Sequence, residues 1–274
     1  MEKRMTNYSI LVNSCDSYSD LWEPFFKLLK IHWPEIVEHE VFLNTETKAF
    51  FMPGIDLRKP SLSELDCTTW SKRFKTCLDQ IHTKYVIILL DDFFLEKDVD
   101  VAKLSECVAI MERDETIKNF SFVPTLWPNK DDGVFADFEL KNKKSPYLLN
   151  LQAGLWRTEE LKSLVRENET PWEFEEWGTH RAAKAGGKYY VAKEGRPQIF
   201  TYNWKPGGAV HRGKWTAGVE KLLKEIDVDI DFNIRGWDED KTKVQKTIRQ
   251  KISDFIWPVV GPIKMQYLYR RYHK

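Results

Sequence analysis

The chain has 274 residues and a mass of 32.4 kDa, with 42% hydrophobic and 31% charged residues, and its 42 basic and 42 acidic residues give no net charge. This length supports one sizeable hydrophobic core, and the composition excludes a low-complexity protein. No segment approaches transmembrane length and the N-terminus lacks the apolar region of a signal peptide, so we expect a cytoplasmic protein. The four cysteines form no CxxC pair, which predicts reduced thiols.

The first half of the chain alternates short apolar runs with amphipathic patterns. Apolar runs of four to six residues indicate buried strands, whereas apolar residues spaced three and four apart indicate helices. The predicted strands are 9–13, 40–43, 85–90 and 120–123, and the predicted helices are 21–29, 70–81 and 101–111. This alternation predicts an α/β fold with a largely parallel sheet.

The second half is less regular. Residues 124–150 are irregular and polar, with Pro124, Pro128 and Asp131-Asp132-Gly133 among them, as is typical of a long functional loop. Helices are expected to start near Thr158 and near Pro171, with short strands at 189–192 and 199–202. A glycine-rich segment follows at 205–215, and the remainder is predicted to be helical and basic.

The C-terminal segment carries most of the charge asymmetry. Residues 241–274 contain nine bases and one acid, a charge of +8, so the preceding residues carry −8. We therefore divide the chain into a catalytic-type domain, 1–235, and a helical basic extension, 236–274. A peripheral contact with an anionic membrane surface and a helix packed on the domain are both open interpretations of this extension. No nucleic-acid recognition motif accompanies the positive charge, so we expect no nucleic-acid partner.

Two adjacent acids, Asp91 and Asp92, follow the buried run 85–90. Ligands of open α/β sheets bind at the carboxyl ends of the strands, so this doublet lies where a site is expected. Carboxylates together with phosphate oxygens are the ligands that Mg²⁺ and Mn²⁺ prefer. The alternative is a pair of solvated turn acids.

A second acidic group lies at the start of the helix near Pro171. Thr170, Pro171 and Glu173 fit a capping box with proline at the first helical position, so Glu173 has a structural explanation. Glu175 differs, because a helical projection places it on a small and apolar face together with Trp172, Phe174, Gly178, Thr179, Ala182, Ala183 and Ala185. The same projection places His180, Arg181 and Lys184 on the opposite face.

An inward-facing carboxylate needs a partner or a function. Partial desolvation would raise the pKa of Glu175 towards that of a general base, whereas an ion pair with an arginine is the structural alternative. Glu176, at the edge of the same face, is the second candidate.

Basic candidates lie on both sides of these acids. His211 lies in the glycine-rich segment and could be a metal ligand, a phosphate contact or simply a polar residue on the surface. Arg212 and Lys214 beside it would suit diphosphate oxygens. Arg73, on the helix before the run 85–90, is a comparable candidate or a solvated helix residue.

Four stretches of the chain resemble bacterial nucleotide-sugar glycosyltransferases of the GT-A fold from surface-polysaccharide gene clusters. They are residues 70–95, with Trp70-Ser71-Lys72-Arg73-Phe74 at their start, 151–157, 171–175 and 212–215, and the resemblance spans roughly the region 1–215. The resemblance implies a Rossmann-like mixed sheet that binds a nucleotide sugar.

The resemblance also implies roles for individual residues. The acidic metal motif falls on Asp91-Asp92, in place of the family's usual Asp-any-Asp, and the catalytic acid at the start of a late helix falls on Glu175. A C-terminal histidine ligand falls on His211. Asp16, in the turn after the first strand, would face the nucleobase, and Gln152 would line the pocket of the donor sugar and acceptor.

We therefore predict an inverting glycosyltransferase that transfers a sugar from a nucleotide-sugar donor to a saccharide acceptor, free or lipid-linked. Asp92 and His211 are predicted to hold Mg²⁺ or Mn²⁺, and Glu175 to be the general base. Asp16, Arg73, Asp91, Gln152, Arg212 and Lys214 are predicted to contact the donor. The alternatives are a sugar-phosphate nucleotidyltransferase, against which no glycine-rich loop follows the first strand, and a non-catalytic carbohydrate-binding scaffold.

Overall fold

The computed structural model describes residues 7–125, 127, 129–203, 205, 207–226 and 228–238. Its main sheet has eight strands in the order β3-β2-β1-β4-β7-β5-β8-β6. The bounds are β1 (Tyr8–Asn13), β2 (Glu40–Asn44), β3 (Asp56–Arg58), β4 (Tyr85–Leu90), β5 (Ile117–Ser121), β6 (Phe138–Leu140), β7 (Gly154–Arg157) and β8 (Lys188–Ala192). Six strands run in one direction and β6 and β7 run against them. The predicted α/β fold with a mixed, mostly parallel sheet is confirmed.

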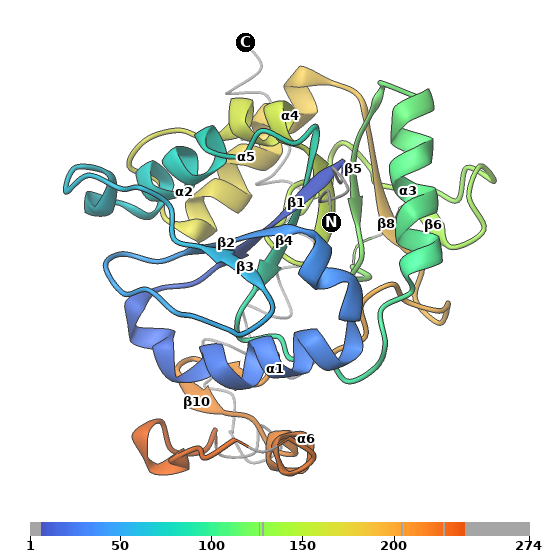
Figure 1. Ribbon diagram of the computed structural model, residues 1–274. Coiled ribbons are helices and arrows are strands. Elements are labelled where there is room, and N and C mark those ends of the chain that lie inside the picture. Colours follow the sequence, from blue (N-terminus) through green and yellow to red (C-terminus); the bar gives the residue numbers. More distant parts are fainter. Residues whose placement is uncertain are drawn as a thin grey trace, which may run out of the picture.

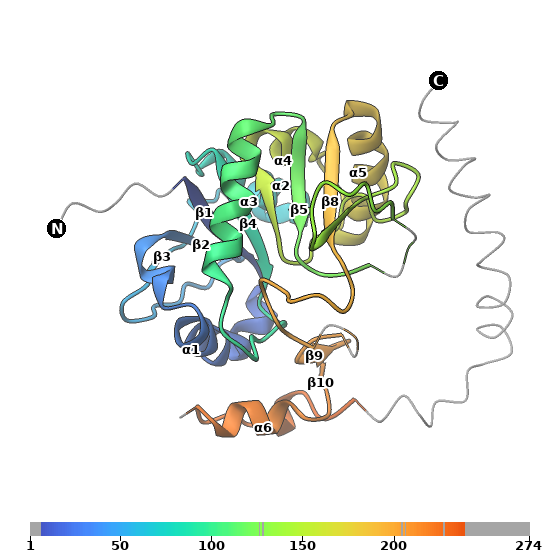
Figure 2. The same cartoon turned by 90° about the vertical axis from the view of Figure 1, so that its right-hand side faces the viewer.

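Helices cover both faces of this sheet. They are α1 (Trp22–His32), α2 (Trp70–Asp79), α3 (Val101–Arg113), α4 (Thr158–Leu164) and α5 (Pro171–Ala185), whereas the short α6 (Val219–Lys224) lies beyond one edge of the sheet (Figures 1 and 2). Four 3₁₀ turns join them, η1 (Asp16–Leu21), η2 (Pro34–Glu38), η3 (Asp66–Thr68) and η4 (Phe232–Ile234). Helices α2, α4 and α5 pack together on one face, and α3 lies on the other (Figures 1 and 2).

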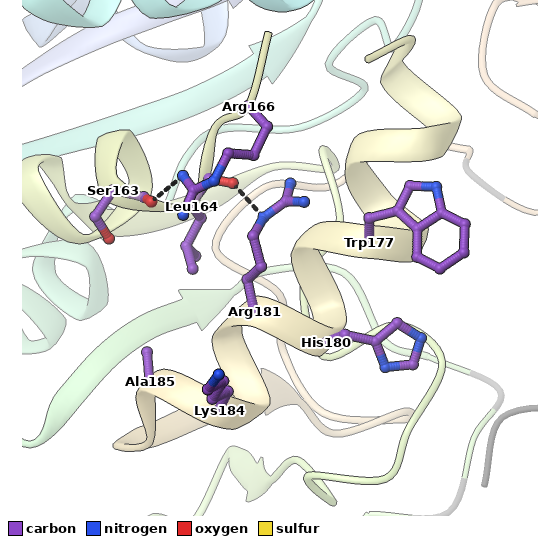
Figure 3. Close-up of a pocket in the computed structure, with 8 residues that line it drawn as sticks. All are labelled: Ser163, Leu164, Arg166, Trp177, His180, Arg181, Lys184 and Ala185. Carbon is purple, nitrogen blue, oxygen red and sulfur yellow. Dashed lines mark hydrogen bonds between the residues drawn. The ribbon is translucent and has the colours of Figure 1, made fainter. Parts of the chain in front are cut away.

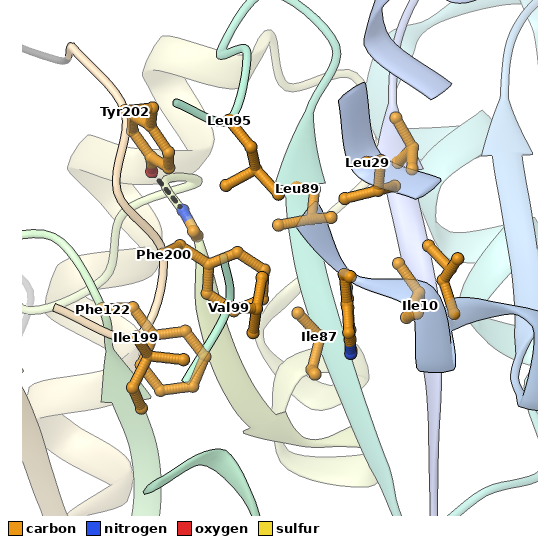
Figure 4. Packing of buried hydrophobic residues seen from close by; sticks show 14 of the residues in the cluster. Ile10, Leu29, Ile87, Leu89, Leu95, Val99, Phe122, Ile199, Phe200 and Tyr202 are labelled. Atoms are coloured by element: carbon orange, nitrogen blue, oxygen red, sulfur yellow. Dashed lines mark hydrogen bonds between the residues drawn. The ribbon is translucent and has the colours of Figure 1, made fainter. Parts of the chain in front are cut away.

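The central strands are buried on both faces, which explains their uninterrupted apolar sequence. Successive side chains of a strand point to opposite faces, so Ile87 and Leu89 join the larger core with α1 and α3, whereas Val86 and Ile88 join the core under α2, α4 and α5. Figure 4 shows the larger core, in which the residues of β4 meet Leu29 of α1.

Two strand predictions are wrong. Strand β5 begins at Ile117, three residues before the predicted start, because the polar Lys118 and Asn119 mask its first half. Asn119 is buried there and donates a hydrogen bond to the carbonyl of Leu155, 3.0 Å away. Residues 199–202 form no strand, although their apolar side chains enter the larger core. Strands β3 and β6, of three residues each, are too short to show an apolar run.

Helix α5 begins as predicted, with a complete capping box between Thr170 and Glu173 and Pro171 in the first turn. Its predicted faces are partly wrong. Trp172 is 76% exposed, whereas His180 is only 5% exposed. Helix α5 is contacted by α2, by α4 and by the segment before β7, so the buried arc is wider than one stripe.

All four cysteines are free, as predicted. In the described part of the chain, every helix is too short or too polar to cross a membrane. The predicted basic extension lies mostly outside the described residues, which end at Asp238.

The capping box of α5 gives a first prediction. Thr170→Ala is expected to lower the free energy of unfolding by about 0.5–2 kcal/mol, because the backbone N–H of Glu173 loses the threonine oxygen at 3.2 Å. Chemical denaturation measures this change. Glu173→Gln, which keeps an acceptor for the N–H of Thr170, is the control and should retain most of the stability. Equal losses in both variants would contradict this explanation.

Candidate active site

The candidate site lies at the edge where β1, β2, β4, β5 and β8 end. A small hairpin of β9 (Val210–His211) and β10 (Lys214–Trp215) lies beyond this edge together with α6 (Figure 2). The hairpin is fixed to the end of β4 by a hydrogen bond of 2.7 Å from the N–H of Ala209 to the carbonyl of Asp92. Gly208, with φ of +81°, packs so closely on that carbonyl that a Cβ atom would clash.

Asp91 and Asp92 have different surroundings although they are neighbours. Asp91 is 3% exposed, and its carboxylate accepts hydrogen bonds from the Ser14 hydroxyl and, at 3.1 Å, from the Trp22 indole. Burial, followed by the charge of Asp92, raises the pKa of Asp91 well above its usual value. These bonds join the ends of β1 and β4, so the Asp91 carboxylate stabilises this edge of the sheet, and its predicted contact with the donor stays a prediction.

Asp92 is half-buried, and its carboxylate accepts no hydrogen bond from any other residue in the described part of the chain. Burial raises the pKa of Asp92 to about 7, although the positive charge of Arg235 acts in the opposite direction. A desolvated carboxylate without a fixed partner is the acid of the doublet that is free to bind a cation.

His211 points one ring nitrogen at a carboxylate. Its Nδ1 lies 2.8 Å from Oδ2 of Asp238, an arrangement that leaves Nε2 for another ligand. Histidine ligands of metals are commonly oriented in this way by a second carboxylate. Within the described ranges, no three His, Cys, Asp or Glu side chains cluster to hold a metal unaided.

Arg212 and Lys214 project from the tip of the hairpin. Arg212 and Gly213 have φ of +53° and +80°, as a tight type I′ turn between paired His211 and Lys214 requires. Both basic side chains are exposed, and neither forms an ion pair with an acid of the described residues. They present two unpaired positive charges beside His211.

Glu175 lies on the inner side of α5, as predicted. Its Oε1 accepts a hydrogen bond of 2.7 Å from the backbone N–H of Leu151. Burial raises the pKa of Glu175, whereas the Leu151 N–H and the charge of Lys141 lower it. No arginine of the described residues pairs with it, and the second oxygen accepts no bond from them.

Residues 151–153 connect the two acidic groups. Leu151 binds Glu175, while the Tyr202 hydroxyl donates to Oε1 of Gln152 at 3.2 Å and accepts from the N–H of Ala153 at 3.3 Å. The Tyr202 ring lies 5.1 Å from the ring of Phe93, the residue after Asp92. The structure therefore brings Asp92, Gln152 and Glu175 to one edge of the sheet.

Asp16 and Arg73 belong to a network beside this edge. The carboxylate of Asp16 accepts from the N–H groups of Thr47 and Lys48 at 3.0 and 3.1 Å, and these bonds lower its pKa against the effect of burial. Arg73 is 4% exposed and binds Glu46 at 2.6 Å and the carbonyl of Ser14 at 3.2 Å. Both side chains hold the loops after β1 and β2 in place, and the predicted donor contacts of both stay predictions.

Four residues of the site were not predicted from the sequence. Tyr202 and Asp238 gave no local signal, and Lys141 lay in a loop that was expected to be polar. Arg235 binds Asp20 at 2.7 Å through Nε, and its guanidinium carbon lies 4.4 Å from the centre of the Tyr18 ring. It thus ties the chain after α6 to η1, which no periodicity could reveal.

A pocket of about 620 Å³ lies elsewhere, between α4 and the outer side of α5 (Figure 3). Arg181 in this pocket forms a bidentate ion pair with Glu169, with two nitrogen–oxygen distances of 2.7 Å. The second half of α5 leads into the start of β8, so this pocket faces the opposite edge of the sheet. Its chemistry gives no reason to place the active site there.

No protein family and no curated protein matches the sequence. Solved structures are similar to it at low sequence identity. S. aureus TarS 1-349 matches with a TM-score of 0.50 and 14% identity, covering 70% of this chain and 59% of that chain. Mannosyltransferase PcManGT from Pyrobaculum calidifontis, in complex with GDP-Man and Mn²⁺, gives 0.44 at 14% identity, covering 70% and 57%. The bifunctional IspDF from Campylobacter jejuni gives 0.40 at 12% identity, covering 70% and 50%.

This chain thus spans less than two thirds of each of these three structures. At this level of identity the likeness to TarS shows the fold alone. It agrees with the mixed sheet and with the GT-A fold that the sequence predicts.

Replacing each acid of the doublet should give opposite changes in stability. Asp91→Ala is expected to lower the free energy of unfolding by about 1–3 kcal/mol, because Ser14 and Trp22 lose a buried acceptor. Asp92→Asn should be more stable than the wild type at neutral pH. The pKa of Asp92 is raised from 3.8 to about 7 in the fold, so its ionisation costs stability as pH rises through this window.

Urea denaturation of both variants between pH 4 and pH 8 provides the measurement. The advantage of Asp92→Asn over the wild type should be absent near pH 4 and grow up to about pH 7. A destabilised Asp92→Asn variant across this range would show that Asp92 has structural partners.

Proposed function

We propose that this protein is a glycosyltransferase that moves a sugar from a nucleotide-sugar donor to a saccharide acceptor with inversion of the anomeric centre. The observation that carries the proposal is the placement of the unpartnered Asp92 and the desolvated Glu175 on one sheet edge, joined through residues 151–153. The fold supports it, because TarS 1-349, which has the same fold, has been solved in complex with UDP-GlcNAc and with UDP.

Glu175 would act as the general base. Its raised pKa increases the basicity of the carboxylate, and the bond from Leu151 occupies only Oε1. Oε2 is then available to accept the proton of an acceptor hydroxyl as that oxygen attacks the anomeric carbon. Direct attack by the acceptor from the side opposite the leaving nucleoside diphosphate inverts the configuration.

Asp92 and His211 would hold a divalent cation. Their fit rests on the absence of a described partner for the Asp92 carboxylate and on the Asp238 bond that orients His211. Two protein ligands suit Mg²⁺ or Mn²⁺, which complete their coordination with phosphate oxygens and water. A bound cation would offset negative charge on the leaving diphosphate.

Arg212 and Lys214 would contact the donor diphosphate from the hairpin, since both cations are exposed and unpaired among the described residues. The network of Asp16 and Arg73 would shape the nucleoside end of the site. A surface-polysaccharide pathway, a lipid-linked acceptor and a membrane contact through the basic extension stay predictions.

Glu175→Gln tests the base. We expect kcat to fall by about 10²–10⁴-fold with a small change in donor KM, because the amide still accepts from Leu151 but takes up no proton. Glu176→Gln is the matched control and should retain activity. Transfer to saccharide acceptors, with UDP-, GDP- and CMP-sugars as donors, is the assay, and NMR of the product anomer tests inversion. Full activity of a folded Glu175→Gln variant would exclude this residue as the base.

Removal of the cation tests the metal site. EDTA is expected to abolish transfer and added Mn²⁺ or Mg²⁺ to restore it. Asp238→Asn should raise the Mn²⁺ concentration needed for half-maximal activity by about 10-fold or more, because His211 loses its orienting carboxylate. His32→Ala removes a comparable pair with Asp98, 2.9 Å apart, and is the control. Transfer that continues unchanged in EDTA would rule out the cation.

Assays with nucleotides and saccharides also distinguish the two alternative functions. Release of pyrophosphate from a nucleoside triphosphate and a sugar phosphate would indicate a nucleotidyltransferase. Saccharide binding without binding of any nucleotide would indicate a carbohydrate-binding scaffold.

A further inference from the structure

Residues 146–151, which we call the strap, lie against α5 just before β7. The hydroxyl of Thr179 accepts from the N–H of Leu149 at 3.1 Å and lies 3.3 Å from the carbonyls of Pro146 and Leu149. One turn earlier, Glu175 accepts from the N–H of Leu151. The position of the Glu175 carboxylate therefore depends on where the strap holds this N–H group.

Lys141 holds the strap from the other side. Its ammonium group donates to the carbonyls of Tyr147 and Leu148 at 3.3 and 3.1 Å and to the hydroxyl of Ser121 at 2.7 Å. The lysine is 3% exposed, and its own N–H is fixed to the carbonyl of Tyr189 at 2.7 Å. Three acceptors satisfy the three donors of the ammonium group.

A buried ammonium group without an ion pair is costly. In the described part of the chain no carboxylate lies within ion-pair distance of Lys141. Burial lowers its pKa to about 7, and the charge of Glu175 acts in the opposite direction. An apolar side chain in this position would avoid the cost of taking a charge out of water, so stability alone does not explain a lysine here.

We propose that Lys141 is a positioning residue: its buried ammonium group fixes the strap, and through the N–H of Leu151 it fixes the Glu175 carboxylate. This inference rests on the proposed function, because it assigns Lys141 a part in orienting the general base. The positive charge has a second effect, since it favours the ionised form of Glu175. Tyr147 and Glu176 are the other titratable groups on this side of the site, and the phenol of Tyr147 feels the charges of both glutamates.

Lys141→Met is the direct test, because methionine is of similar length and donates no hydrogen bond. Without the three donors, we expect the amides of the strap to exchange hydrogen at least about 10-fold faster, while those of β2 keep their protection. Hydrogen exchange followed by mass spectrometry on the full chain without substrate measures this. Lys193→Met is the matched control, because this half-buried lysine binds Asp131 at 2.7 Å and makes no contact with the strap.

Kinetics test the consequence for the base. In Lys141→Met, kcat should fall by about 10-fold or more with donor KM changed less than about 3-fold, because the donor contacts remain. The acid limb of the kcat profile should move to higher pH, because loss of the positive charge raises the pKa of Glu175. Thr179→Val should also speed hydrogen exchange of the strap and lower kcat. Because this variant keeps the charge of Lys141, it lacks the shift of the acid limb that loss of that charge would cause.

The outcomes decide between the two proposals. Unchanged strap exchange in Lys141→Met would overturn the positioning role, and so would normal kcat with an unmoved acid limb in a folded variant. If Lys141→Met does not fold, Thr179→Val supplies the exchange and kcat measurements, and unchanged values there overturn the proposal. If the wild type transfers no sugar but strap exchange responds as expected, the proposed function fails while the hold of Lys141 on the strap stands.

Discussion

The site depends on the antiparallel insertion of β7 between β4 and β5. Gly154 pairs with Ile88 of β4 and with Ser121 of β5, so the chain just before Gly154 runs past the carboxyl ends of both strands. A parallel strand in this place would deliver residues 151–153 to the opposite edge. Because β7 is reversed, these residues connect Glu175 of α5 with Tyr202 and, through Phe93, with the end of β4.

Local sequence patterns predicted the secondary structure correctly where a strand is buried on both faces or where a helix starts with a capping box. The run 85–90 is a central strand, and the Thr170–Glu173 box starts α5 where the sequence placed it. They failed where packing from several sides decided burial, as for Trp172 and His180 of α5. They also failed at β5, where Asn119 is buried because a carbonyl of β7 accepts its amide. Lys141 and Arg235 acquire their surroundings only through contacts between distant segments.

The acidic doublet shows how surroundings separate two identical side chains. Neighbouring residues leave a strand end on different sides, and only Asp91 meets the donors of Ser14 and Trp22. Asp92 meets the hairpin instead, which contacts its carbonyl and leaves its carboxylate without a described donor. Asp91 is thus held by protein donors, whereas Asp92 has none among the described residues. Sequence alone could name the pair but not divide the roles.

The ion pair between Arg235 and Asp20 has a consequence for the order in which parts of the chain fold. It joins residues 215 positions apart, whereas the strands of the main sheet are complete at Ala192. Contacts between residues so distant in sequence form late and slowly. During synthesis the sheet, α5 and the strap can fold before the hairpin and Arg235 leave the ribosome. The nascent protein would then pass through a state in which the sheet, α5 and the strap are folded but the candidate site still lacks the hairpin.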